Sequence, residues 1–151
     1  MSLSVRAAQI SDLPAVFALV RGMFVDLGTP DFHPSWAKDV TDALRDRMGR
    51  DVAVSVAVDG TNIIAVAVGL VEQRLPSPRR PSGRIGYIEW LATDPRHRRR
   101  GAARLAMENL LAWFEAQEVR LVDVHASAAA RTLYEQFGFE PPTASALRWR
   151  G

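Results

Sequence analysis

The fold is decided between Ile85 and Met107, where the chain reads IGYIEWLATDPRHRRRGAARLAM. Up to Thr93 this stretch is rich in β-branched and aromatic residues, which favours a strand. Asp94-Pro95 ends the strand, because proline has no N–H to donate to a neighbouring strand. Beyond Gly101 the apolar residues recur at intervals of three and four, which predicts a helix. The stretch is therefore predicted to be a strand, an arginine-rich turn and a helix.

The turn from Arg98 to Ala103 has the features of an anion-binding site. The first N–H groups of a helix have no partner within it, and the positive end of the helix dipole faces outward, so a helix that begins here can hold a phosphate. Gly101 has no side chain that would keep a phosphate from the backbone, and the small Ala102 and Ala103 extend this clearance. From the residues alone, a solvated basic turn, or a nucleic-acid contact through Arg96–Arg100, remains an alternative.

The rest of the chain alternates predicted strands and helices, which is typical of an α/β protein. One domain over residues 1–151 is expected from this length. The expected elements are a strand Leu3–Ala7, a helix that begins at Ser11 or Asp12, a loop Gly28–Pro34, a helix Trp36–Met48, strands Val52–Val58 and Ile63–Val71 around a turn Asp59–Asn62, an exposed loop Leu75–Gly83, a strand Val119–Val124 and a helix that begins at Ser127.

The amino-acid composition excludes several kinds of functional site. The chain has no cysteine, which excludes disulfides, thiolate metal sites and a thiol nucleophile. Its three histidines are scattered, so no metal site is predicted. The net charge is only +2, from 19 basic and 17 acidic residues, and gives nucleic-acid binding little support. Since no signal-peptide pattern or membrane-spanning apolar stretch is present, we expect a cytoplasmic protein that contacts no membrane.

A second motif, Leu133-Tyr134-Glu135-Gln136-Phe137-Gly138-Phe139, lies about thirty residues beyond the arginine-rich turn. In this order, the Arg-x-x-Gly-x-Ala turn, a strand and the Leu-Tyr-x-x-x-Gly-Phe helix end resemble the GNAT superfamily of acyl-CoA-dependent N-acetyltransferases. Val5–Ala8 followed by Ser11–Leu13 also resembles the opening strand and helix of that family, so the resemblance covers most of the chain.

The resemblance implies a mixed, twisted sheet of about six strands with helices on both faces. It also implies a cleft where the strand ending at Thr93 splays from the strand ending near His125. Acetyl-CoA would lie in that cleft as the co-substrate, with its pantetheine arm along the strand edge and its pyrophosphate on the turn. The residues implied for binding it are Leu91, Ala92, Thr93, Arg98, Arg99, Arg100, Gly101, Ala102, Ala103, Arg104, Ser127 and Tyr134. Ser127 stands where the family often has asparagine, and a hydroxyl cannot replace both the donor and the acceptor of an amide.

Glu89 is the candidate catalytic base. An acceptor amine with a lysine-like pKa near 10.4 must lose a proton before it attacks, which costs about 4.6 kcal/mol at pH 7. Glu89 is the only carboxylate within the strand Ile85–Thr93, and strict alternation would place it on one face with Tyr87 and Leu91. An ordinary exposed or ion-paired strand residue is the alternative, and an ordered water chain could instead act as the base.

Tyr134 is the candidate general acid, because a phenol in the cleft could protonate the departing sulfur. The alternative is an aromatic residue that only packs against the cofactor. His125 ends the preceding strand and could relay a proton, or simply be a packed residue at the strand end.

Together these features predict an N-acetyltransferase that moves the acetyl group of acetyl-CoA directly to a primary amine of a small molecule or peptide, without a covalent enzyme intermediate. A catalytically inactive CoA-binding regulatory module is one alternative, and a nucleic-acid-binding module that uses Arg96–Arg100 is another. The sequence leaves open whether the protein is a homodimer, and nothing in it identifies the acceptor amine.

Overall fold

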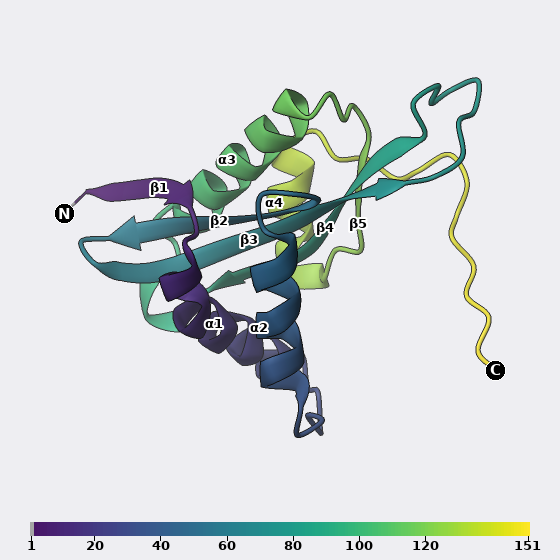
Figure 1. The fold of residues 1–151 in the computed structure, drawn as a ribbon. Coiled ribbons are helices and arrows are strands. Elements are labelled where there is room, and N and C mark those ends of the chain that lie inside the picture. The colour runs from purple at the N-terminus through teal and green to yellow at the C-terminus, as the bar shows by residue number, and fades with distance from the viewer. Residues whose placement is uncertain (1) are drawn as a thin grey trace.

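The computed structural model describes residues 2–151, which form a five-stranded mixed sheet in the order β1-β2-β3-β4-β5 (Figure 1). The first four strands pair antiparallel, whereas β5 pairs parallel to β4 over only three residue positions. The strands are β1 (Leu3–Ala7), β2 (Val52–Asp59), β3 (Asn62–Gln73), β4 (Arg84–Thr93) and β5 (Val122–Val124).

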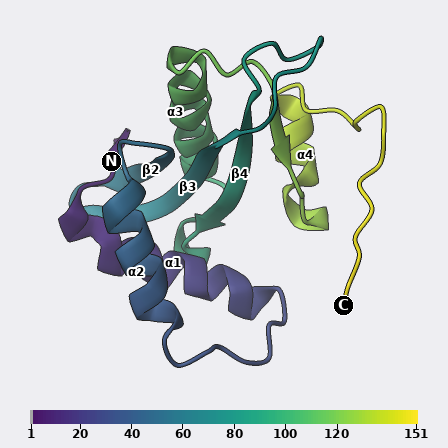
Figure 2. The same ribbon diagram turned by 45° about the vertical axis from the view of Figure 1, so that its right-hand side comes forward.

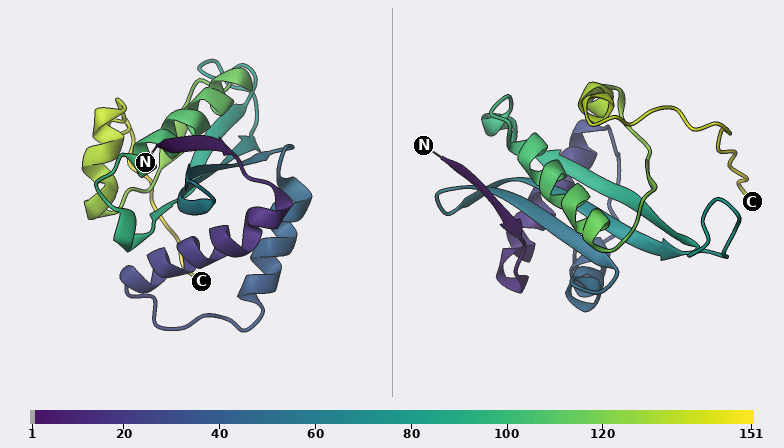
Figure 3. Two further views of the ribbon diagram at one scale, coloured as in Figure 1. Left: turned by 90° about the vertical axis from the view of Figure 1, so that its left-hand side faces the viewer. Right: turned by 90° about the horizontal axis from the view of Figure 1, so that it is seen from above.

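Helices cover both faces of the sheet (Figure 2). On one face lie α1 (Leu13–Asp26), which follows a 3-10 turn η1 (Ile10–Asp12), and α2 (Trp36–Arg47). The other face carries α3 (Ala102–Ala116), which follows the 3-10 turn η2 (Pro95–His97). Beside β5 lies α4 (Ala128–Gln136), whose buried Tyr134 belongs to the same apolar cluster as α3 (Figure 3). None of the helices within residues 2–151 is long and apolar enough to cross a bilayer.

Apolar clusters on both faces of the sheet hold these layers together. Val16 and Val20 of α1 pack on the valines of β2 and β3. On the opposite face, Phe114 of α3 lies so close to the sheet that a methyl group on Gly69 or Gly86 would come within 2.7 or 2.8 Å of its ring. Such contacts explain glycine in two central strands, where it otherwise weakens a sheet.

The predicted fold class is confirmed, with five strands in the described residues rather than about six. β5 is also shorter than the predicted strand Val119–Val124. Its first residues end α3 instead: Glu118 takes a left-handed conformation with φ 59°, and the Val119 N–H donates to the Phe114 carbonyl at 3.0 Å. Residues 137–151 form no strand in this structure, so the sixth strand is missing from the sheet.

Candidate active site

Glu89 occupies a β-bulge in β4. Ile88 lies opposite Gly69 of β3 and Trp90 lies opposite Val68, so Glu89 is an extra residue without a partner on that strand. Bulges bend a strand and re-aim side chains, and they are common beside active sites. The irregularity therefore falls at the residue that the sequence singled out as the candidate base.

The bulge makes one sequence prediction wrong. Strict alternation would group Glu89 with Leu91, but Leu91 packs into the α3 cluster, while Trp90 packs into the α1 cluster on the opposite face. The extra residue shifts the alternation by one position from Trp90 onward. Leu91 therefore faces α3, and its backbone rather than its side chain remains the part predicted to bind acetyl-CoA.

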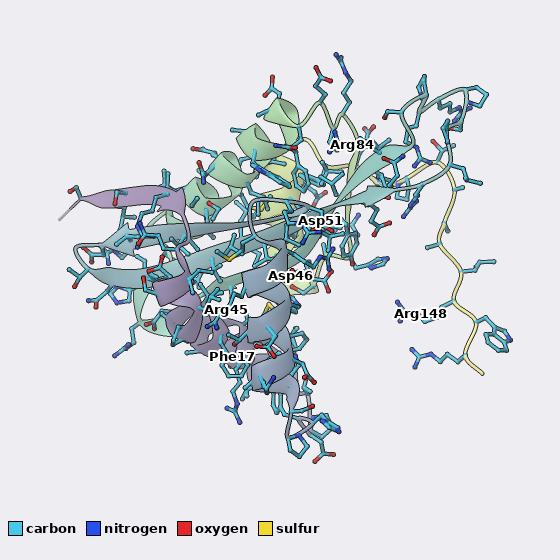
Figure 4. The ribbon with its side chains drawn as sticks, viewed as in Figure 1. Phe17, Arg45, Asp46, Asp51, Arg84 and Arg148 are labelled. Atoms are coloured by element: carbon cyan, nitrogen blue, oxygen red, sulfur yellow. The ribbon has the colours of Figure 1, made fainter. Side chains whose placement is uncertain are left out.

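The exposed Glu89 carboxylate lies close enough to Arg47 of α2 and Tyr87 of β4 to influence both. The pKa of Arg47 is raised chiefly by its hydrogen bond to Asp51 and further by the charge of Glu89. The pKa of Tyr87 is raised chiefly by burial and then by the charge of Glu89. Asp51 lies where α2 returns to the sheet (Figure 4). Glu89 is therefore on the side of the sheet that α1 and α2 cover.

Tyr87 and His125 form a bridge between β4 and β5. The Tyr87 hydroxyl and His125 Nδ1 are 2.8 Å apart, although 38 positions separate them along the chain. Pairing of the two strands ends one residue later, at Ile88 opposite Val124. The bridge thus stands where the strands separate. Sequence reasoning missed Tyr87 as a site residue, although its position two residues before Glu89 on one strand was the available signal.

Tyr134 approaches the same region from α4. Its side chain is 5% exposed and packs against Phe139, with 5.4 Å between ring centroids. Burial raises the pKa of the phenol to about 12, with a smaller contribution from Tyr87. Among the described residues the hydroxyl has no hydrogen-bond partner, yet no fully buried polar atom is left unpaired, so the hydroxyl oxygen must reach solvent. A neutral phenol with a free hydroxyl is available there.

The turn before α3 presents its backbone outward. Arg99 and Gly101 both adopt left-handed conformations, with φ of 63° and 79°. The helix begins with the Leu105 N–H donating to the Gly101 carbonyl at 3.0 Å, so the N–H groups of Ala102, Ala103 and Arg104 have no acceptor in the preceding turn of helix. A Cβ at Gly101 would meet no atom within 4 Å. Left-handed residues on either side of Arg100 and an open approach at Gly101 are features of the backbone nests that bind anions.

Most of the arginines of the turn have partners inside the protein. Arg98 pairs with Asp26 of α1 at 3.0 Å. Arg100 pairs with Asp59 of β2 at 3.0 Å. Arg104 bonds Gln136 of α4 and lies over the ring of Phe137. In the part of the chain that the structure describes, only Arg99 of these four has no hydrogen bond or ion pair. Arg98 and Arg100 thus anchor the turn to α1 and β2, and Arg104 ties α3 to α4.

Asp94 fixes the start of the turn. Its carboxylate accepts the Arg96 N–H at 2.9 Å and binds the Arg96 guanidinium at 3.0 Å. These hydrogen bonds, more than any other influence, lower the pKa of Asp94 to about 2. The turn is therefore held at both ends, by Asp94 at one and by α3 at the other.

The remaining predicted cofactor residues lie beyond the point where pairing of β4 with β5 ends, on β4 and at the start of α4. Leu91, Ala92 and Thr93 pair with β3 on one side, but β5 has already ended beside Ile88, so within residues 2–151 their other edge has no strand partner. Ser127 caps α4, where its hydroxyl accepts the Ala130 N–H at 3.3 Å. Its hydroxyl hydrogen stays free to donate. Backbone groups of Leu91–Thr93 on that edge are thus left without a strand partner in the described part of the chain.

An aromatic cluster lies between α1 and α2, on the Glu89 side of the sheet. The Trp36 ring is 4.9 Å from Phe17, 5.6 Å from Phe24 and 5.2 Å from Phe32, measured between centroids. Phe17 is visible on α1 where the two helices meet (Figure 4). Trp36 is half-buried and contacts all three phenylalanine rings of this cluster. Among residues 2–151 no group of three or more metal-ligating side chains is found.

Comparisons with known proteins agree with this geometry. The family model described as "Acetyltransferase (GNAT) family" matches residues 21–139. A predicted acetyltransferase with acetyl-CoA from Clostridium acetobutylicum has a TM-score of 0.88 and 21% identity, over 99% of this chain and 96% of that one. A GCN5-related N-acetyltransferase from Ralstonia eutropha JMP134 has a TM-score of 0.78 and 26% identity, over 99% and 100%. A glucosamine-6-phosphate N-acetyltransferase from Arabidopsis thaliana has a TM-score of 0.75 and 20% identity, over 99% of both chains. No curated protein matches the sequence.

Proposed function

Because the chain belongs to the GNAT acetyltransferase family, we propose that it is an N-acetyltransferase that moves the acetyl group of acetyl-CoA to a primary amine of a small molecule or peptide. The observation that carries the proposal is the outward-facing turn Arg98–Ala103 beside a gap in the sheet, with bulged Glu89 on one face and buried Tyr134 on the other. The turn supplies a phosphate site, and the two side chains supply a base and an acid.

The residues around the gap fit acetyl-CoA. The turn offers several unpaired N–H groups in a nest that is open at Gly101, as a pyrophosphate requires. The free edge of Leu91–Thr93 offers backbone donors and acceptors to an extended chain such as pantetheine. Acetyl-CoA supplies the thioester when bound, and these residues would hold it across the gap.

Glu89 is proposed to take a proton from the acceptor amine, directly or through one water. Its exposed carboxylate lies on the face of the sheet that carries α1, α2 and the Trp36 cluster, and the acceptor would approach from that face. Removing the proton from a lysine-like amine costs about 4.6 kcal/mol at pH 7, which a nearby base offsets.

Tyr134 is proposed to supply a proton to the departing sulfur. Its pKa of about 12 keeps the phenol protonated at neutral pH, as an acid must be before it acts. Full transfer to a thiolate with an ordinary pKa near 8.5 would be uphill by about 4.8 kcal/mol, so the phenolate has to be reprotonated at once. Tyr87, which lies near Tyr134 and is bonded to the exposed His125, offers a route for that proton from solvent.

The nucleic-acid alternative is weakened by a specific observation. Arg98, Arg100 and Arg104 are engaged with α1, β2 and α4, so they do not form a free basic patch. A nucleic-acid module would show steeply salt-dependent binding to oligonucleotides that coenzyme A does not inhibit. A CoA-binding regulator would bind acetyl-CoA without consuming it in the presence of any amine.

The decisive experiment is a screen of acceptors for release of free coenzyme A. The chain contains no cysteine, so a thiol reagent reports the released cofactor without background from the protein. The panel should hold simple amines, amino acids, peptides, aminoglycosides and glucosamine 6-phosphate. Amine-dependent thiol release and an acetylated product would support the proposal. Stabilisation by acetyl-CoA without turnover on any amine would favour the regulator, and no stabilisation would refute cofactor binding itself.

A further inference from the structure

Glu89 carries a negative charge that has no counterpart bound to it. Its side chain is exposed at the bulge, and within residues 2–151 it forms no hydrogen bond and no ion pair. Arg47 of α2, on which the charge of Glu89 acts, is bound instead to the carboxylate of Asp51 at 2.7 Å. The Glu89 carboxylate is therefore available to a positively charged group of a ligand.

Arg148 carries a positive charge that is equally unpaired. It is exposed, and it forms no hydrogen bond or ion pair with any residue that the structure describes. After α4 the chain runs down to the side of the sheet that carries α1 and α2 (Figures 1, 2 and 3). Arg148 stands on this last part of the chain (Figure 4). Its guanidinium is thus on the same side of the sheet as the Glu89 carboxylate.

Tyr87 shows that the two charges lie in one region of this side. Burial is the largest cause that raises the pKa of Tyr87, the charge of Glu89 raises it further, and the charge of Arg148 lowers it. Exposed charges are largely screened beyond about 8 Å at physiological ionic strength, so charges that act on one hydroxyl lie within the reach of a small molecule. Glu89 and Arg148 nevertheless do not pair with each other. One carboxylate and one guanidinium are thus free near the same phenol.

We propose that the acceptor is a zwitterionic small molecule, whose ammonium group lies at Glu89 and whose carboxylate or phosphate lies at Arg148. This inference rests on the proposed N-acetyltransferase function and names the class of amine. A guanidinium can bind two oxygens of either anion through two parallel N–H groups. The two opposite charges would also orient the acceptor, because reversing it would place like charges together.

Paired acceptors test the class of substrate. Each pair keeps the amine and removes the anion: β-alanine with propylamine, 3-aminopropylphosphonate with propylamine, and glucosamine 6-phosphate with glucosamine. We expect kcat/KM to be about tenfold or more higher for the anionic member of the best pair, and the pairs separate a carboxylate from a phosphorus oxyanion. Equal or faster turnover of the neutral members would overturn this inference and leave the N-acetyltransferase proposal standing. No turnover of any amine, in these pairs or in the wider panel, would refute both.

Arg148→Gln tests the residue. The ratio of kcat/KM between the anionic and the neutral member of the best pair should fall by about tenfold, mainly through KM. The matched control is Arg120→Gln, since Arg120 is also exposed and unpaired in the described chain but lies between α3 and β5. Its ratio should stay at the wild-type value. Stabilisation by acetyl-CoA in thermal unfolding shows that each variant is folded.

Charge reversal gives the sharpest result. Arg148→Glu should disfavour the anionic acceptor further and improve turnover of 1,3-diaminopropane, because the second ammonium group would then meet a carboxylate. A ratio that is unchanged in Arg148→Gln, or that falls equally in Arg120→Gln, would overturn the proposal, as would an Arg148→Glu variant that keeps the wild-type preference.

Discussion

Replacing Tyr134 by phenylalanine separates the packing of its ring from the chemistry of its hydroxyl. The side chain is 5% exposed within the α3 cluster, and its hydroxyl has no hydrogen bond to another described residue. Tyr134→Phe therefore keeps the buried ring and leaves no polar group without its hydrogen-bond partner. The loss of stability at neutral pH should be below about 1 kcal/mol. Any larger effect of the substitution on stability or turnover has to come from the proton that the hydroxyl carries.

The magnitude of that effect on stability follows from the pKa. Burial holds the pKa of Tyr134 at about 12 in the folded protein, against 10.0 for an ordinary tyrosine. Below pH 10 both states keep the proton, so stability does not depend on it. As the pH rises, the unfolded chain ionises first and stability falls, by about 1.4 kcal/mol at pH 11 and by up to about 2.7 kcal/mol once the pH exceeds 12. Tyr134→Phe should lack this loss.

Urea unfolding at pH 8 and pH 11 measures the difference between the wild type and Tyr134→Phe. Tyr87 is present in both proteins, so its own raised pKa cancels in the comparison. A wild type that loses no more stability than the variant between the two pH values would refute the buried, protonated phenol.

Turnover with saturating acetyl-CoA provides the second readout. If Tyr134 protonates the sulfur, kcat should fall by about 10² or more while the affinity for acetyl-CoA stays nearly constant. Weaker cofactor binding with unchanged kcat would mean that the hydroxyl only binds coenzyme A. Unchanged binding and turnover would assign Tyr134 to packing alone.

Three further substitutions test the turn and the base. Gly101→Val should weaken acetyl-CoA binding at least tenfold, whereas Gly28→Val, at a similarly open position with φ 82°, should cost comparable stability but leave binding unchanged, as calorimetry would show. Glu89→Gln should lower turnover most at low pH, where the amine is protonated, and a loss that does not vary with pH would argue against a base. Asp94, with its pKa of about 2 against 3.8, contributes stability that is lost as the pH falls through this range, so Asp94→Asn should flatten the acid-unfolding curve there; an unchanged curve would contradict this.

The sequence was sufficient to predict the strand, turn and helix between Ile85 and Met107, because each has a local cause. Period-two and helical patterns define the flanking elements, and Gly101 supplies the left-handed residue at the helix start. The bulge at Glu89 has no such local signature, because it is a property of two strands and appears only when Ile88 and Trp90 are paired with β3. For that reason the face of Leu91 was predicted wrongly.

Contacts between side chains that lie far apart along the chain could not be predicted from the sequence either. The resemblance implied Arg99, Arg100 or Arg104 near a phosphate, but no local pattern predicted that Arg98 and Arg100 bind Asp26 and Asp59, which lie 72 and 41 positions away. The Tyr87–His125 bridge likewise depends on β5 lying beside β4, which no local pattern specifies. The sequence indicated which segments are helices, strands or basic turns. It did not indicate which charged side chains form ion pairs.

The two proposed catalytic groups approach the gap from opposite faces of the sheet, and this separation bears on how both can act. Glu89 lies on the face of α1 and α2, whereas Tyr134 lies on the face of α3 and α4. A thioester held along the free edge of β4 would then have its carbonyl carbon open to an amine from the first face and its sulfur directed toward the second. Because pairing of β4 with β5 ends at Ile88, the two groups can act on opposite sides of such a thioester. The bulge removes Glu89 from the strand ladder and leaves its carboxylate on the α1–α2 face, from which we propose that the amine comes.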